Sequence, residues 1–198
     1  MLDARHLPED PIALFGAWLE AAKQTAMPLP ESMALATTDL SGHPSVRMVM
    51  LHVATSQGFT FYTDYESRKG HELAKNPRAS LLFFWSSLGC QVRIEGDVSK
   101  LSGQESDKYF EGRPRESQLA AWASKQSSMI AGRDELLQEW GKYNRQFSGD
   151  IPRPPRWGGY RLRHQLVEFW KGDQHRLHDR ILYTRQNADS WSFARISP

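Results

Sequence analysis

Hydrophobic and polar residues follow a helical period at the start of the chain. Apolar positions recur there every three to four residues: Ile12, Phe15, Leu19 and Ala22. This spacing places the four side chains on one face of a helix. Asp10 followed by Pro11 is typical of a helix start, because Asp accepts hydrogen bonds from free backbone N–H groups and Pro is tolerated at the first helical position. We therefore predict an amphipathic helix that begins at Asp10 and ends before the proline-rich residues 27–31.

A period of two, typical of strands, dominates much of the remaining chain. The predicted strands cover residues 33–38, 44–53, 58–63, 79–85, 91–98, 157–163, 166–170, 181–184 and 191–196. Residues 79–85 are continuously apolar, so we expect that strand to be buried on both faces. Helices are predicted over residues 67–75, after the capping box of Ser102 and Glu105, over residues 116–123, and where Leu136, Trp140, Tyr143 and Phe147 recur.

The order of these elements predicts a mainly β fold with peripheral α-helices, of the α+β class. Short strands joined by turns, with helices inserted late, favour an antiparallel barrel. The chain lacks the glycine-rich strand-to-helix fingerprint of a doubly wound nucleotide-binding fold. Its length of 198 residues favours a single domain spanning residues 1–198.

Composition narrows the classes of function. The formal net charge is +2, which is too small to indicate a nucleic-acid partner by itself. The single cysteine, Cys90, excludes an internal disulfide and a multi-cysteine metal site. No apolar run approaches the roughly 20 residues that cross a membrane, and residues 1–10 lack the basic start and apolar core of a secretory signal. We expect a cytoplasmic protein with neither nucleic acid nor a membrane as a partner.

Basic side chains gather in segments whose residue types suit phosphate. Within one strand, Arg47 and His52 differ in parity and should face opposite sides, so they would serve neighbouring sites. The alternative is a strand that carries an exposed surface arginine. At residues 62–69 a strand ends and a helix begins, and the helix N-terminus favours an anion. Arg68 and Lys69 oppose the helix dipole there unless an anion lies nearby, although solvated basic residues are an alternative.

A third segment combines a phenol, a guanidinium group and a hydroxyl, which can together surround a second phosphate. These residues are Tyr109, Arg113 and Ser117. The alternative is a surface loop with an Arg–Glu pair. Three further polar residues suit the edge of a heterocycle, or else are ordinary buried polar groups; they are Gln91, Gln126 and Ser127.

The densest polar cluster follows Trp170 and covers residues 175–180. It contains two His, two Arg and one Asp within six residues. Such a group is costly unless it is solvated or used for function. The interleaved arginines would repel a cation, and no cysteine ligand stands nearby, so we expect no metal site here.

Six blocks of sequence together resemble the pyridoxamine 5'-phosphate oxidase family. The blocks are Ser67-Arg68-Lys69, Arg113-Pro114-Arg115-Glu116-Ser117-Gln118, Ser124-Lys125-Gln126-Ser127-Ser128, Trp157-Gly158-Gly159-Tyr160, Glu168-Phe169-Trp170 and Arg176-Leu177-His178-Asp179-Arg180. Each block alone is weakly specific, but six in the right order and spacing are highly specific. The match runs in order from about Leu7 to Pro198.

The resemblance implies an FMN-binding split β-barrel of the antiparallel Greek-key type. Such proteins are homodimers with one FMN in each of two clefts between subunits, and the C-terminal strands, about residues 157–198, complete the site. The implied reaction converts pyridoxamine or pyridoxine 5'-phosphate to pyridoxal 5'-phosphate and reduces O2 to hydrogen peroxide. The implied FMN contacts are Arg47, Met48, Val49, Met50, Leu51, Tyr62, Thr63, Arg68, Lys69, Gln91, Gln126, Ser127, Trp170 and Arg180. The implied substrate contacts are His52, Tyr109, Arg113, Ser117, Arg176, Leu177 and His178, of which Arg176 and His178 are the expected catalytic residues.

The chain departs from the family pattern at two positions. His52 stands where a Lys usually helps to bind the substrate phosphate, which predicts weaker phosphate binding at alkaline pH than a Lys enzyme would show. Cys90 stands where an Arg often precedes Gln91, and its alternative reading is a small packed thiol. These departures keep open a protein that binds FMN or pyridoxal 5'-phosphate without turnover. A further alternative is a related flavin oxidase that acts on another aromatic substrate, such as a phenazine-pathway enzyme. Tyr109, Arg113 and Ser117 argue against the latter, because a substrate without phosphate would not need them.

Overall fold

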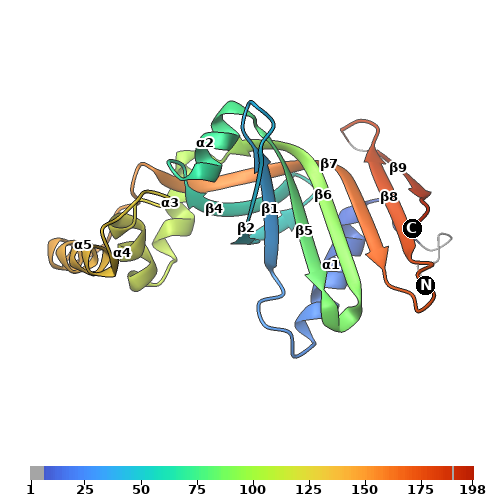
Figure 1. The fold of residues 1–198 in the computed structure, drawn as a ribbon, viewed down its shortest axis with the longest axis horizontal. Helices are drawn as coiled ribbons and strands as arrows, with labels where there is room; N and C mark the ends of the chain where they lie inside the picture. Colours follow the sequence, from blue (N-terminus) through green and yellow to red (C-terminus); the bar gives the residue numbers. More distant parts are fainter. Residues whose placement is uncertain (1–6, 189) are drawn as a thin grey trace.

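The computed structural model describes residues 7–188 and 190–198, and nine antiparallel strands form its centre (Figure 1). The strands are β1 (Ser32–Thr38), β2 (Pro44–Met50), β3 (Val53–Thr55), β4 (Gly58–Asp64), β5 (Arg78–Trp85), β6 (Cys90–Lys100), β7 (Trp157–Lys171), β8 (Asp179–Arg185) and β9 (Trp191–Arg195). The helices are α1 (Pro11–Lys23), α2 (Arg68–Lys75), α3 (Gly103–Glu111), α4 (Arg115–Ala123) and α5 (Arg133–Gln146), with a short 3-10 turn, η2 (Ser86–Leu88). None of the helices in the described ranges is long and apolar enough to cross a membrane.

The strands pair in the order β2-β1-β5-β6-β7-β4-β3, and β8 and β9 continue the sheet beside β7. The two ends of this order are neighbours in the chain, because β3 begins three residues after β2 ends. Between them the N–H of Leu51 donates to the carbonyl of Glu31 and the N–H of His52 donates to that of Thr60, at 2.9 and 2.8 Å. The sheet therefore curls toward a barrel, as expected for antiparallel strands of this length.

Alternate side chains of the strands fill the interior, and α1 packs against it. Phe15 of α1 lies with its ring centroid 4.9 Å from that of Phe59 and 5.0 Å from that of Phe83, both in edge-on contacts. The indole N–H of Trp85 donates to the carbonyl of Pro30 at 2.9 Å, which satisfies the polar atom of a fully buried ring. Asp10 caps α1 as predicted, accepting from the N–H of Ile12 at 2.9 Å.

A second, smaller core lies under α3, α4 and α5, at one end of the molecule and away from β8 and β9 (Figure 1). Its buried members are Phe110, Leu119, Ala121, Ile151 and Trp157. The four residues that predicted the last helix are half-buried, and three of them, Trp140, Tyr143 and Phe147, pack on this core. The predicted capping box is present, with Ser102 and Glu105 satisfying each other's backbone N–H groups.

The structure corrects several of the predicted strands. Residues 44–53 are not one strand, because β2 ends at Met50 and the chain crosses to β3; Arg47 and His52 therefore diverge through that crossing and not through strand parity. Residues 79–85 are not buried on both faces. Leu81 and Phe83 are fully buried, whereas Phe84 is 54% exposed, so apolar residues occupy both the inner and the outer face of β5.

Residues 157–163 and 166–170, predicted as separate strands, form the single strand β7. The register against β6 shifts between Glu95 and Gly96, which marks a β-bulge. A Cβ atom at Gly96 would lie 2.0 Å from the carbonyl oxygen of Arg163, so only glycine permits this close approach. His164 and Gln165, which lie between the two predicted ranges, are thus part of one bent strand.

Candidate active site

The turn from β4 into α2 gathers three cationic side chains, which we call the α2 nest: Arg47, Arg68 and Lys69. Ser67 caps α2 by accepting from the N–H of Gly70 at 3.3 Å, and a Cβ at Gly70 would lie 2.1 Å from the carbonyl oxygen of Tyr65. This close packing fixes the helix N-terminus against the end of β4. Arg68 and Lys69 therefore extend from a rigid turn.

Lys69 is a buried ammonium group without a carboxylate contact in the described part of the chain. Its Nζ donates to the side-chain oxygens of Gln126, Thr63 and Ser67 at 2.5, 3.2 and 3.3 Å. Burial, and then the charge of Arg47, lower the pKa of Lys69 to about 8. An ammonium group that is desolvated in this way is stabilised by an anion placed beside it.

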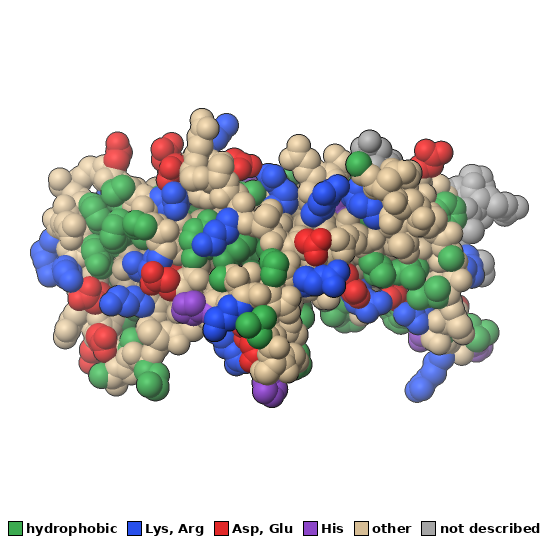
Figure 2. Space-filling model, turned by 90° about the horizontal axis from the view of Figure 1, so that it is seen from above, with side chains coloured by type: hydrophobic (Ala, Val, Ile, Leu, Met, Phe, Trp, Pro, Cys, Tyr) green, Lys and Arg blue, Asp and Glu red, His purple; other side chains and the backbone are tan. Residues whose placement is uncertain are grey.

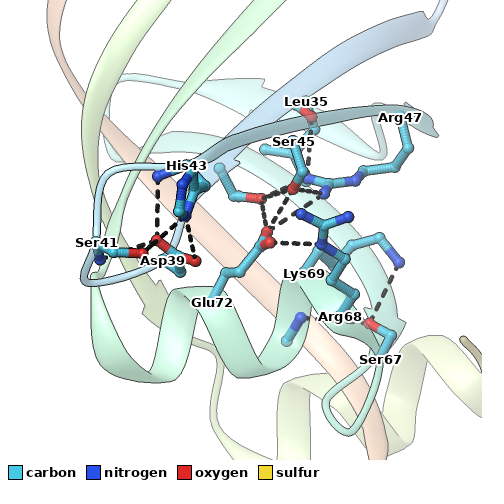
Figure 3. A network of polar contacts seen from close by, with 12 residues as sticks. Leu35, Asp39, Ser41, His43, Ser45, Arg47, Ser67, Arg68, Lys69 and Glu72 are labelled. Atoms are coloured by element: carbon cyan, nitrogen blue, oxygen red, sulfur yellow. Dashed lines mark hydrogen bonds and ion pairs between the residues drawn. The ribbon is translucent and has the colours of Figure 1, made fainter.

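Arg47 and Arg68 share one carboxylate, that of Glu72 (Figure 3). The guanidinium of Arg47 also donates to the carbonyl of Leu35 at 3.1 Å. The side chain of Arg68 is 63% exposed, and its Nε donates to Glu72 at 2.9 Å. The sequence hypotheses did not include Glu72, although its spacing of four residues from Arg68 on a helix is a signal that would have identified the pair.

The loop after α4 brings Gln126 to the α2 nest. Arg156 fixes this loop, donating from Nη2 to the carbonyls of Ala121, Trp122 and Ser124 at 2.7, 2.8 and 3.1 Å. Its Nε donates to the buried carboxylate of Asp64 at 3.1 Å. Ser127 has a φ of 71°, a left-handed conformation uncommon for serine. Gln126 and Ser127 are exposed, and the hydrogen bonds of Arg156 hold the base of the loop that carries them.

A second group of side chains, which we call the aromatic nest, comprises His52, Tyr62, Tyr109, Arg113 and Trp157. Its β4 member, Tyr62, directly precedes Thr63, which contacts Lys69 of the α2 nest. The rings of Tyr62 and Tyr109 stack with centroids 3.7 Å apart, and the guanidinium of Arg113 lies 4.3 Å over the ring of Trp157. The Nη1 atom of Arg113 is buried and has no hydrogen-bond partner within the described residues. Burial lowers the pKa of Arg113, so this guanidinium group is a desolvated donor without an acceptor.

His52 packs edge-on against Tyr109 and Tyr62, with ring centroids 4.5 and 5.3 Å away. Partial burial against these rings lowers the pKa of His52 from its ordinary value, so the imidazole is neutral near pH 7. Ser117 is half-buried in the first turns of α4. Arg115 forms no ion pair with Glu116 within the described residues and instead donates to the carbonyls of Phe147 and Gly149, so it has a structural role.

The remaining predicted residues lie at the other end of the sheet. Trp170 pairs with Gln91 across β6 and β7 and with Arg180 across β7 and β8. The ring of His178 lies 4.7 Å from that of Trp170, and its Nδ1 accepts from the N–H of Asp173 at 3.1 Å. Arg176 has a φ of 61° in the exposed loop before β8.

A buried carboxylate, Glu168, organises this end of the sheet. It accepts from Arg180 at 2.8 Å and from Arg93 at 2.5 Å, and sequence reasoning gave it no role of its own. In Figure 1, β8 lies at the opposite end of the long axis from α3 and α4. One chain therefore does not unite Arg113 with Arg176.

Apolar side chains cover the outer face of β2, β1 and β5, which we call the outer apolar face. Met48, Ala34 and Leu82 are direct partners across the three strands. Val46, Met48, Met50 and Phe84 are 69%, 62%, 45% and 54% exposed, whereas Val49 and Leu51 of the same segment turn inward. From above, Lys and Arg side chains lie along the molecule between acidic and apolar ones (Figure 2). Cys90, by contrast, is buried at the start of β6, as a packed thiol would be.

Comparisons with known proteins find related sequences over nearly the whole chain. A family model described as pyridoxamine 5'-phosphate oxidase matches residues 19–143, and one described as the pyridoxine 5'-phosphate oxidase C-terminal dimerisation region matches residues 157–198. A curated relative from Burkholderia pseudomallei (strain K96243), named pyridoxine/pyridoxamine 5'-phosphate oxidase, is 48% identical over 199 residues, covering 100% of this chain and 93% of that protein. A relative of the same name from Cupriavidus taiwanensis is 50% identical over 189 residues, covering 96% and 89%.

Solved structures share the fold. PhzG from Burkholderia lata 383, in complex with tetrahydrophenazine-1-carboxylic acid, matches with a TM-score of 0.93 at 32% identity, covering 100% of this chain and 98% of that one. A pyridoxamine 5'-phosphate oxidase-related, FMN binding protein from Nostoc punctiforme PCC 73102 matches with a TM-score of 0.76 at 18% identity, covering 97% and 100%; at this identity it shows the fold alone. These matches confirm the predicted mainly β split barrel with peripheral helices.

Proposed function

The chain belongs to the pyridoxamine 5'-phosphate oxidase family, and from that premise we propose that it oxidises pyridoxamine and pyridoxine 5'-phosphates to pyridoxal 5'-phosphate. The amine reaction consumes O2 and water and releases ammonia and hydrogen peroxide; the alcohol reaction consumes O2 and releases hydrogen peroxide. The observation that carries the proposal is the presence of two separate groups of basic side chains: the α2 nest, where Lys69 contacts Thr63 of β4, and the aromatic nest, where Arg113 lies beside Trp157 and the preceding β4 residue is Tyr62. Two phosphorylated ring compounds, cofactor and substrate, would occupy them.

The α2 nest fits the phosphate of FMN. Lys69 is desolvated without a carboxylate contact among the described residues, and the N-terminus of α2 adds partial positive charge. Arg47, Arg68 and Lys69 would hold the phosphate, with Thr63, Gln126 and Ser127 beside it. The segment Met48–Leu51 and Tyr62 would border the rest of the cofactor. The ring system would meet Gln91, Trp170 and Arg180, which lie together at the other end of the sheet.

A second copy of the chain would bring the two ends together. The C-terminal part matches a dimerisation region, which supports a homodimer. The outer apolar face is exposed in one chain, and burial of exposed apolar surface drives association. In this proposal residues 1–198 form one domain, and the strands of residues 157–198 complete the active site of the partner.

The aromatic nest would bind the phosphate of the substrate. Arg113 offers a buried, unpartnered donor, and the phenol of Tyr109 and the hydroxyl of Ser117 stand on adjacent helices. A phosphate oxygen would satisfy the orphan nitrogen of Arg113, which removes the cost of leaving it unpaired. Neutral His52 adds a hydrogen bond but no full charge.

FMN, when bound, accepts a hydride from the substrate and transfers electrons to O2. The chain positions the substrate and manages its protons. Arg176 and His178, on the loop before β8, would border the substrate ring together with Leu177. The guanidinium of Arg176 would orient the substrate and favour loss of the proton from its amine or hydroxyl, and His178 would hydrogen-bond the ring substituents. The contact of His178 Nδ1 with the N–H of Asp173 requires Nδ1 to be unprotonated, which leaves Nε2–H as the donor.

A second candidate function is oxidation of a phenazine precursor. The PhzG match, with its bound tetrahydrophenazine-1-carboxylic acid, favours it, because fold and length agree over the whole chain. The buried guanidinium of Arg113 favours the phosphorylated substrate instead. Identities of 48–50% with the curated oxidases, against 32% with PhzG, point the same way.

Air oxidation by the flavin-loaded protein tests the proposal. We expect pyridoxamine 5'-phosphate to yield pyridoxal 5'-phosphate and hydrogen peroxide in equal amounts. Formation of pyridoxal 5'-phosphate is measured by its absorbance. Unphosphorylated pyridoxamine serves as the matched control and should react far more slowly. Binding of pyridoxamine 5'-phosphate without peroxide would instead identify a carrier protein. Turnover of a dihydrophenazine carboxylate, with no reaction of either B6 compound, would favour the second candidate.

A further inference from the structure

A buried carboxylate, Glu72, lies behind the α2 nest and is not one of the expected ligand contacts (Figure 3). Its residue is 6% exposed, on the second turn of α2. Its Oε1 accepts from Nε of Arg68 at 2.9 Å. Its Oε2 accepts from the hydroxyl groups of Thr37 and Ser45 at 2.5 and 2.6 Å and from Nη2 of Arg47 at 3.4 Å. Strands β1 and β2 and helix α2 thus converge on one carboxylate.

Every group that hydrogen-bonds to this carboxylate donates to it, which favours the ionised form. Burial by itself raises the pKa of Glu72. The two hydroxyl groups and the two guanidinium groups outweigh burial and lower the pKa to about 2. Glu72 therefore carries its negative charge near neutral pH.

The contacts fix the orientation of both guanidinium groups. Arg47 is held at Nη1 by the carbonyl of Leu35 and the hydroxyl of Thr37, and at Nη2 by Ser45 and Glu72. Arg68 is held only through Nε, and its two terminal nitrogens have no acceptor within the described residues. This arrangement directs the free edge of Arg68 away from the carboxylate, where a ligand can meet it.

The α2 nest carries a net positive charge. Arg47, Arg68 and Lys69 bring three positive charges, and Glu72 is the one carboxylate with which they form ion pairs in the described chain. The net charge of about two matches a phosphate monoester dianion. Burial lowers the pKa of Arg47, Glu72 raises it, and the charge of Arg68 lowers it again, so the carboxylate offsets the repulsion between the arginines.

We propose that Glu72 is a positioning residue for the cofactor phosphate: it holds Arg47 and Arg68 apart in fixed orientations, so that the nest accepts a dianion and not a neutral group. This inference rests on the proposed use of FMN. It adds a role for a residue that touches no ligand. A flavin that lacks the phosphate should not depend on Glu72 at all.

Binding of FMN and of riboflavin to the flavin-free full-length chain, followed by quenching of flavin fluorescence, tests the inference. In Glu72→Gln the amide nitrogen would face donors, so one guanidinium would lose its partner and turn away. We expect the dissociation constant for FMN to rise by about 10- to 100-fold, as for loss of a charge-assisted contact. The dissociation constant for riboflavin should stay within about twofold of the wild-type value, since no hydrogen bond to the phosphate is involved.

Glu66→Gln is the matched control, because Glu66 is exposed in the turn before α2 and forms no ion pair in the described chain. It removes the same charge nearby without touching the arginines, and FMN affinity should hardly change. Glu72→Asp keeps the charge but shortens the side chain, so it should fall between wild type and Glu72→Gln. Melting of each flavin-free variant identifies any that does not fold, and Glu72→Asp then carries the test.

Three outcomes would overturn the inference. Equal or tighter FMN binding by Glu72→Gln would mean that the carboxylate merely opposes the phosphate. Equal weakening of FMN and riboflavin would mean that it supports the fold alone. Failure of the wild-type chain to bind FMN would instead remove the proposed function, and the inference with it.

Discussion

The α2 nest and the aromatic nest both present guanidinium groups, but they hold them in different ways. In the α2 nest, Arg47 is hydrogen-bonded on both sides and Glu72 balances part of the charge. In the aromatic nest, Arg113 is held by the face of Trp157, and its Nη1 has no partner in the described chain. A site whose side chains are already held by hydrogen bonds suits a ligand that stays bound, because the geometry of the site is set before the ligand arrives. A site with an orphan donor and a neutral histidine suits a ligand that enters and leaves.

The substitution Arg113→Ala is the strongest test of this difference between the two nests. We expect kcat/KM for pyridoxamine 5'-phosphate to fall by about 100- to 1,000-fold, because one partner of a desolvated charge pair is lost. FMN affinity should be unchanged, since Arg113 lies outside the α2 nest. The measurement is steady-state peroxide production beside an FMN titration. Equal losses with unphosphorylated pyridoxamine would show that Arg113 supports the fold and not the phosphate.

The reciprocal substitution is Lys69→Met, which removes the buried ammonium group at similar length. We expect FMN affinity to fall by about 10- to 100-fold, because a charge-assisted contact with the phosphate is lost. The KM for pyridoxamine 5'-phosphate in the flavin-saturated variant should remain near that of the wild type. A shift in KM as large as the shift in FMN affinity would contradict the separation of the two nests.

The pH dependence of FMN binding also tests the role of Lys69. In the flavin-free protein the pKa of Lys69 is about 8, and a bound phosphate would raise it. Affinity should therefore be highest below pH 8 and fall as the pH rises above it, because the neutral amine must then take up a proton to bind. Fluorescence titrations from pH 6 to 9.5 measure the fall. Lys69→Arg should flatten the profile over that range, and an equally steep fall in that variant would assign the effect to another group.

The smallest effect is expected for His52→Lys, which restores a charge to the aromatic nest. Partial burial lowers the pKa of His52, so the wild-type imidazole gains its proton only on the acidic side of its ordinary range. The KM for pyridoxamine 5'-phosphate should fall about two- to fivefold at pH 8, as expected for a partly exposed charge pair. The advantage of Lys should shrink as the pH falls from 8 into the acidic range, as His52 gains its proton. A constant ratio of the two KM values across this range would exclude His52 from phosphate binding.

Sequence reasoning predicted most elements of the fold because their signals are local. The cap of α1 by Asp10 and the capping box of Ser102 are set by neighbouring residues. The strand over residues 44–53 was wrong because its end depends on distant partners, the carbonyls of Glu31 and Thr60. The prediction that residues 79–85 are buried on both faces was wrong, because a run of apolar residues looks the same whether its outer face meets protein or solvent.

The candidate site could be predicted only in part. The basic residues stood out by type and by resemblance, and whether they contact FMN or substrate stays a prediction. The carboxylates that organise them, Glu72 and Glu168, were missed as site residues, because each meets its partners across different strands and helices. Likewise the ring contact that holds Arg113 depends on Trp157, far along the chain.

Strand β7 has a consequence for the spacing between sites. It begins with Trp157 in the aromatic nest and carries Trp170 near its other end. At about 3.3 Å per residue the two tryptophans stand roughly 40 Å apart along one continuous backbone. Under the proposed function, this strand sets the distance between the substrate pocket of its own chain and the flavin contacts around Trp170 that it would provide to its partner. The bulge opposite Gly96 sets the bend of this strand, so a side chain added there should shift the aromatic nest relative to Trp170, although it would contact neither.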